Sequence, residues 1–98
     1  MYVGACQVRL RLPDSHSLKD KRQVVKSVLA RVRAHFEVAA AEVADQDVWQ
    51  IATLGLACVS NDPAHAEDIL QHAARYIEES RPDIEITDVQ IEVQRAFD

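Results

Sequence analysis

The stretch CQVRLRL, residues 6–12, decides how the chain folds, because its apolar and polar side chains alternate without a break. This period of two is typical of a strand with one face buried and one exposed. The strand is expected to run from Tyr2 to Leu12, since Pro13 ends it. A half-buried strand needs a covering layer on its apolar side.

Two helices are predicted to supply that layer. The first runs from Leu18 to about His35, with Ser17 as a capping residue and an apolar stripe at helical spacing. The second begins at Asn61-Asp62-Pro63, a capping side chain followed by proline at the first helical position. Its apolar stripe is Ala66, Ile69, Leu70, Ala73 and Ile77, and it stops before Ser80.

Three further strands complete the pattern. The first is marked by Phe36, Val38 and Ala40, the second by Ala52, Leu54, Leu56 and Cys58, and turn-forming residues 44–48 join them as a hairpin. The last runs from Ile84 to about Arg95, and a change of parity predicts a bulge near Thr87-Asp88. The order βαββαβ predicts one α+β domain over residues 1–98, a ferredoxin-like sandwich with a four-stranded antiparallel sheet. Its strand order is 4-1-3-2, with both helices on one face and the other face open.

The length and composition restrict the function further. Ninety-eight residues form one core and exclude a two-domain enzyme. The N-terminus has no signal-peptide pattern and the chain has no apolar run of membrane-spanning length, so we expect a cytoplasmic protein with no membrane partner. Cys6 and Cys58 have no zinc-site spacing, and we expect two buried, reduced thiols.

The net charge of −5 disfavours nucleic acid for the molecule as a whole, but the charge is divided unevenly along the chain. Residues 1–35 hold eight Lys and Arg against two Asp, a sum of +6, and residues 36–98 hold three against fourteen, a sum of −11. On the first helix, Lys19, Arg22, Lys26 and Arg33 fall on one arc opposite the apolar stripe. Such a row suits a phosphate backbone, or is simply a solvated face.

Arg9 and Arg11 point from the first strand onto the open face of the sheet. Because this strand is central, the two charges lie in the middle of that face. They are available to a nucleic acid, or they pair across strands with acidic residues such as Glu92.

A second polar cluster is expected where the loop after the first strand meets the hairpin. Lys21 falls inside the apolar arc of its helix, which is explained if its amine reaches Asp45, Asp47 or Glu42. With His16 and Ser17 at the helix start, it forms either a structural ion pair or an anion-binding site.

Trp49, Ile51 and Val59 are predicted to form an interface. By parity they share the open face, which is apolar and carries small residues on this side. We expect a homodimer through that face or an edge strand, although Trp49 also has the option of folding against its own hairpin.

No catalytic, metal or cofactor motif is present in the sequence. The loop after the first strand lacks the glycines of an anion-cradling acylphosphatase loop, and the four histidines are spaced unsuitably for a metal. We therefore expect a non-enzyme without cofactors.

Four stretches resemble a known family: HSLKDKRQVVKS (residues 16–27), AEVADQDVWQ (41–50), LGLACVSND (54–62) and HAE (65–67). They are similar to the YlxP-like family of small bacterial proteins of unknown function. Relatives often carry a basic residue after the Trp-Gln pair, where this chain has Ile51. The resemblance implies a ferredoxin-like fold, no established catalytic residues, and genes near ribosome-maturation and translation-initiation factors. We therefore expect a non-catalytic factor that binds rRNA or the small ribosomal subunit. The alternative is a homodimeric protein-interaction or anion-sensing module.

Overall fold

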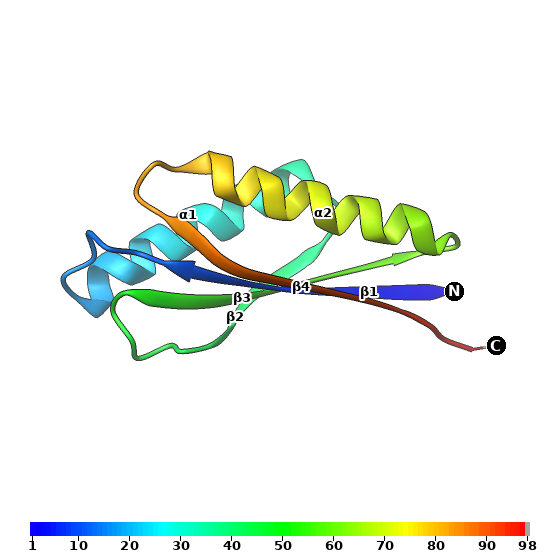
Figure 1. The fold of residues 1–98 in the computed structure, drawn as a ribbon, viewed down its shortest axis with the longest axis horizontal. Coiled ribbons are helices and arrows are strands. Elements are labelled where there is room, and N and C mark those ends of the chain that lie inside the picture. The colour runs from blue at the N-terminus through cyan, green and yellow to red at the C-terminus, as the bar shows by residue number, and fades with distance from the viewer. Residues whose placement is uncertain (98) are drawn as a thin grey trace.

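The computed structural model describes residues 1–97 and has the predicted order of strands and helices (Figure 1). The elements are β1 (Tyr2–Arg11), α1 (Leu18–His35), β2 (Ala39–Ala44), β3 (Ile51–Ser60), α2 (Pro63–Ser80) and β4 (Glu85–Arg95). All strand pairs are antiparallel, in the order β2-β3-β1-β4. This is the predicted order 4-1-3-2 read from the other edge, so the ferredoxin-like α+β fold is confirmed.

The two helices lie side by side on one face of the sheet, and no element within residues 1–97 covers the other face (Figure 1). Helix α2 packs on β1, β3 and β4, whereas α1 contacts β2 and α2. The long strands give the molecule extents of 47 × 22 × 20 Å. Helix α1 therefore flanks the β2 edge of the sheet, and β4 forms the opposite edge.

Both helices begin at the predicted capping residues. The Ser17 hydroxyl accepts from the Asp20 N–H at 3.0 Å, and the Asp20 carboxylate accepts from the His16 N–H at 3.1 Å. This reciprocal pair satisfies two backbone donors at the start of α1. In α2, Asp62 accepts from the N–H two residues on at 3.0 Å, and Pro63 occupies the first turn.

The start of β2 differs from the prediction. Phe36 is the C-cap of α1, because its N–H donates to the Val32 carbonyl at 2.9 Å, and β2 begins only at Ala39. The Phe36 ring packs edge-on against Tyr76 of α2, with centroids 5.6 Å apart. The apolar residue that resembled a strand residue thus holds α1 against α2.

The predicted bulge in β4 is confirmed. Arg9 pairs with Asp88 and Leu10 with Ile86, which leaves Thr87 as the extra residue. The Thr87 hydroxyl donates to the Arg9 carbonyl at 3.3 Å. A second, unpredicted register shift leaves Val43 as an extra residue in β2. These bulges reset which side chains face the helices.

The core lies between the sheet and the helices and includes both cysteines. Cys6 and Cys58 are buried and free, as predicted, and burial raises the pKa of the Cys6 thiol to about 11. Burial also raises the pKa of Cys58, whose Sγ lies 3.7 Å from the Ala66 carbonyl oxygen. Neither thiol has the lowered pKa of a reactive cysteine.

Candidate functional site

Three cations lie exposed on one flank of α1. Lys19, Arg22 and Lys26 follow one another at spacings of three and four residues, which places them on one side of the helix. Within residues 1–97 their side chains form no hydrogen bond or ion pair. Their charges are therefore directed to solvent.

Arg33 shares this flank but has a structural partner. Its guanidinium donates to the Ala40 carbonyl of the edge strand β2, whereas Arg31, on the other flank, donates to the Ser80 carbonyl at the end of α2. The cationic row therefore lies on the side of α1 facing β2, rather than directly opposite the apolar stripe as predicted. Lys19, Arg22 and Lys26 are its free members.

Lys21 is completely buried, and its ammonium pairs with Glu42 of β2 at 2.9 Å. It also donates to the Asp45 carbonyl at the end of the hairpin. The prediction that Lys21 pairs with an acidic residue is thus confirmed, with Glu42 as the carboxylate. Glu42 Oε2 has no hydrogen-bond partner within the described chain, so its contact with Lys21 is an ion pair rather than a directed hydrogen bond.

The three predicted anion-binding residues do not share one accessible surface, because Lys21 is buried. His16 is exposed and Ser17 caps α1, but the Lys21 ammonium has no exposed surface to offer a ligand. Anion binding by His16, Ser17 and Lys21 stays a prediction, and the position of Lys21 does not favour it.

The strand arginines form long ion pairs on the open face. Arg9 lies 3.7 Å from Asp45 and Arg11 lies 3.8 Å from Glu85, and both side chains stay more than half exposed. Glu92, the partner suggested by the sequence, pairs in register with Ala5 instead. The arginines therefore pair structurally and are still accessible to a partner.

Asp45 connects the two layers of the molecule. It adopts a left-handed backbone conformation with a φ of 60°. Its carboxylate accepts from the Thr53 hydroxyl at 2.7 Å and faces Arg9, while its carbonyl accepts from Lys21. The sequence showed Asp45 only as a turn former and a candidate carboxylate, because the use of its carbonyl depends on the tertiary fold.

The three predicted interface residues do not form one patch. Val59 is 66% exposed, whereas Ile51 is half-buried at the other end of β3. They are eight positions apart along β3, a distance of about 27 Å. Trp49 lies in the hairpin loop before β3, so strand parity does not assign its face, and it is 53% exposed.

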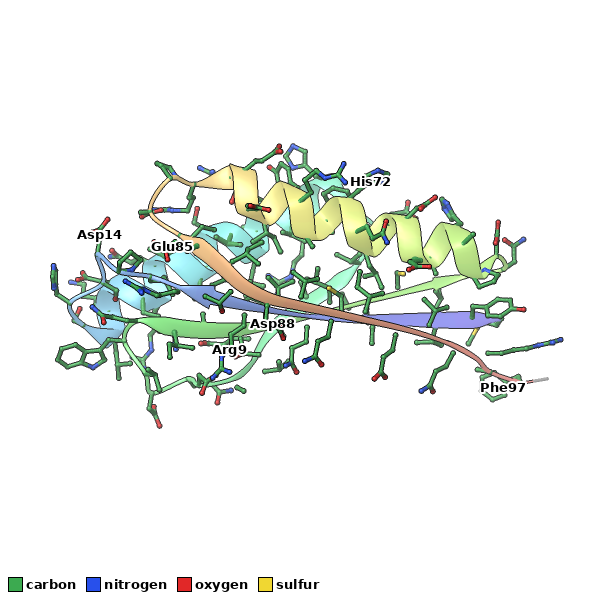
Figure 2. All side chains as sticks on the ribbon, in the orientation of Figure 1. Arg9, Asp14, His72, Glu85, Asp88 and Phe97 are labelled. Carbon is green, nitrogen blue, oxygen red and sulfur yellow. The ribbon has the colours of Figure 1, made fainter. Side chains whose placement is uncertain are left out.

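The open face is hollowed rather than flat. A trough of about 510 Å³ crosses the sheet from β2 over β3 and β1 to β4. Its lining includes Ala5, Ala39, Ala41, Gly55 and Ala57, together with Val43, Gln7, Gln90 and Glu92. A Cβ on Gly55 would come within 2.7 Å of Val43, so the glycine lets the Val43 side chain lie over the strand. Figure 2 shows side chains that project below the sheet on this face, among them the labelled Arg9.

Residues 1–97 hold no group of three His, Cys, Asp or Glu side chains that could bind a metal ion. Neither described helix is long and apolar enough to cross a membrane.

The fold and surface thus define a small ferredoxin-like protein with a cationic helix flank and an open sheet face. The chain belongs to the family described as "Protein of unknown function (DUF503)", which matches residues 3–91. It is 38% identical over 85 residues to "Uncharacterized protein YlxP" of Bacillus subtilis (strain 168), covering 87% of this chain and 91% of that protein. The resemblance to a YlxP-like family is thereby confirmed.

Proposed function

We propose that this protein is a non-catalytic RNA-binding factor that associates with the small ribosomal subunit in its maturation or in translation. The observation that carries the proposal is the row of exposed, unpartnered cations Lys19, Arg22 and Lys26. Neutralising RNA phosphates releases counterions, which favours binding to such a row.

The cationic row destabilises its helix through charge repulsion, and this supports a role for the row in binding a partner. Lys19 and Arg22 are three residues apart and Arg22 and Lys26 are four apart, and like charges at these spacings repel by about 0.2–0.5 kcal/mol per pair. None of the three has an acidic residue three or four positions away on the helix. Among the acidic residues of positions 1–97, none forms an ion pair with these three cations. A bound phosphate backbone would relieve the repulsion.

The charge of the neighbouring helix supports one side of α1 for the approach of RNA. Residues 18–35 carry six Lys and Arg and one Asp, a sum of +5, whereas residues 63–80 carry one Arg and four acidic residues, a sum of −3. Because α2 repels phosphates, RNA is expected on the flank of α1 that faces β2. Arg9 and Arg11 lie on the open face of the sheet, and both are accessible to an RNA that extends from this flank past the β2 edge.

Charge reversal tests this function. The double variant Lys19→Glu/Lys26→Glu is compared with Arg75→Glu, which reverses an exposed cation on acidic α2, in co-sedimentation with small ribosomal subunits and in binding to their rRNA. We expect the double variant to lose binding and the Arg75 variant to bind like wild type. The log of wild-type affinity should fall with log salt, with a slope of about −2 for three contacts to single-stranded regions. Unchanged binding by the double variant, or no binding by wild type at low salt, would refute the function.

The trough favours a second candidate, a homodimeric protein-interaction module. Small apolar residues line the trough. Val43 of β2 and Val59 of β3 add exposed apolar surface to the open face. Light scattering after size exclusion would then give twice the 11.0 kDa mass, and Ala41→Glu would return the protein to monomer. A monomer at high concentration would exclude this dimer.

A further inference from the structure

Trp49 is a large aromatic side chain with no structural role that accounts for its position. It is 53% exposed, and within residues 1–97 it makes no hydrogen bond or ring contact. It therefore does not fold against its own hairpin in the way that would bury it. An exposed indole on a surface is a favourable platform for another flat group.

The loop that carries Trp49 is held firmly. The side chain of the next residue, Gln50, donates to the carbonyls of Pro13 at 3.3 Å and Ser15 at 3.2 Å, and its carbonyl accepts from the Leu12 N–H at 2.8 Å. On the other side of Trp49, the Val48 N–H donates to the Asp45 carbonyl at 3.1 Å. An aromatic ring on an anchored loop loses little freedom when it binds.

These contacts also place the loop beside the start of α1. Ser15, which accepts from Gln50, lies four residues before Lys19, the first of the exposed cations. Figure 1 shows the β2–β3 connection and the chain entering α1 at the same end of the molecule. The cationic row continues from there for about 10 Å, from Lys19 to Lys26, at 1.5 Å per helical residue.

We propose that the ligand of this surface is single-stranded RNA, with one base stacked on Trp49 and the adjoining phosphates along Lys19, Arg22 and Lys26. This inference rests on the proposed RNA-binding function and names the form of RNA it binds. An aromatic platform joined to a cationic track is the arrangement that binds single strands, since a duplex keeps its base faces covered. Asp47, exposed two residues before Trp49, repels phosphates and directs the strand toward α1.

The only tryptophan in the chain makes the test direct. Binding of a short unstructured RNA and of the same sequence as a duplex is measured by anisotropy of a labelled strand, and Trp49 fluorescence is recorded with unlabelled RNA. We expect quenching by the single strand and not by the duplex. Trp49→Leu should weaken single-strand binding about 5- to 150-fold, Trp49→Phe should retain most of it, and Asp47→Asn should strengthen it.

The outcomes separate this inference from the proposed function. If single strand and duplex bind equally and Trp49→Leu has no effect, while Lys19→Glu/Lys26→Glu still abolishes binding, the stacking site is refuted and the RNA-binding function stands. If neither RNA binds at low salt, both are refuted. Circular dichroism of the Trp49 variants checks that a loss of RNA binding does not arise from unfolding. Because Trp49 is exposed, we expect both variants to fold like the wild-type protein.

Discussion

Replacing Lys21 by methionine should destabilise the fold, although methionine is apolar and similar in length. Lys21 is completely buried, so its removal leaves the Glu42 carboxylate without its counter-charge and the Asp45 carbonyl without one of its donors. Glu42 Oε2 has no hydrogen bond within residues 1–97 to compensate. The variant therefore places an unpaired charge at the boundary between helix layer and sheet.

The size of the effect follows from the burial of the pair. Removing one partner of a fully buried ion pair costs about 3–5 kcal/mol. Glu42 is 18% exposed, so water reaches it and lowers the cost to about 2–4 kcal/mol. For a domain of this size each kcal/mol shifts Tm by about 4–8 °C, which predicts a fall of roughly 8–32 °C.

Urea and thermal unfolding followed by circular dichroism measure this change. Arg22→Met is the matched control, because Arg22 is the next residue on α1 but exposed and unpartnered, and it should change stability by less than about 0.5 kcal/mol. Adding Glu42→Leu to Lys21→Met should recover much of the loss, since an apolar pair can replace a buried ion pair at little cost. A Lys21→Met protein as stable as the Arg22→Met control would refute the reasoning.

Three further predictions concern other parts of the molecule. Because burial raises the pKa of Cys6 to about 11, its thiol should react with Ellman's reagent only after denaturation; rapid labelling of the native protein would contradict this. Arg81 hydrogen-bonds Asp83 at 2.8 Å and lowers the pKa of that carboxyl, so the stability lost in Asp83→Asn should be full at neutral pH. The difference in unfolding free energy between wild type and Asp83→Asn should vanish as acid protonates Asp83 in the wild-type protein. A difference that stays constant across pH in urea unfolding would contradict this. Gly4→Ala should cost about 1–3 kcal/mol in thermal unfolding, because the new Cβ lies 2.8 Å from a buried leucine of α2, whereas Gly55→Ala meets only an exposed valine and should cost less.

Features set by local sequence were predictable. The bounds of α1 followed from Ser17 and the apolar stripe, and the bulge at Thr87 followed from the change of parity in β4. The need for an acidic partner of Lys21 was also foreseeable, because a charged residue inside an apolar arc must be paired or neutralised, although the sequence left three carboxylates open. Each of these inferences depends either on residues close together in the sequence or on the general rule that a buried charge is paired, and neither requires the tertiary structure.

Features set by tertiary contacts were not. Arg33 donates to the Ala40 carbonyl, and nothing in the sequence tells which side of α1 borders the edge strand. The trough arises where alanines from β1, β2 and β3 meet Gly55, so it depends on the register between strands. The small residues at alternate positions were a visible signal in the sequence, but they did not indicate a hollow, because its depth comes from the neighbouring side chains.

The buried Lys21 also separates geometry from charge in the proposed RNA site. Its ammonium and the Val48 N–H share the Asp45 carbonyl, so Lys21 helps to hold the loop that carries Trp49. At a temperature where the protein stays folded, Lys21→Met should weaken single-strand binding without changing the slope of log affinity against log salt, because a buried ammonium releases no counterion. Lys19→Met should instead reduce that slope by about 0.7. Anisotropy titrations across salt distinguish the two, and a reduced slope in Lys21→Met would show that Lys21 reaches the RNA, against its burial in the fold.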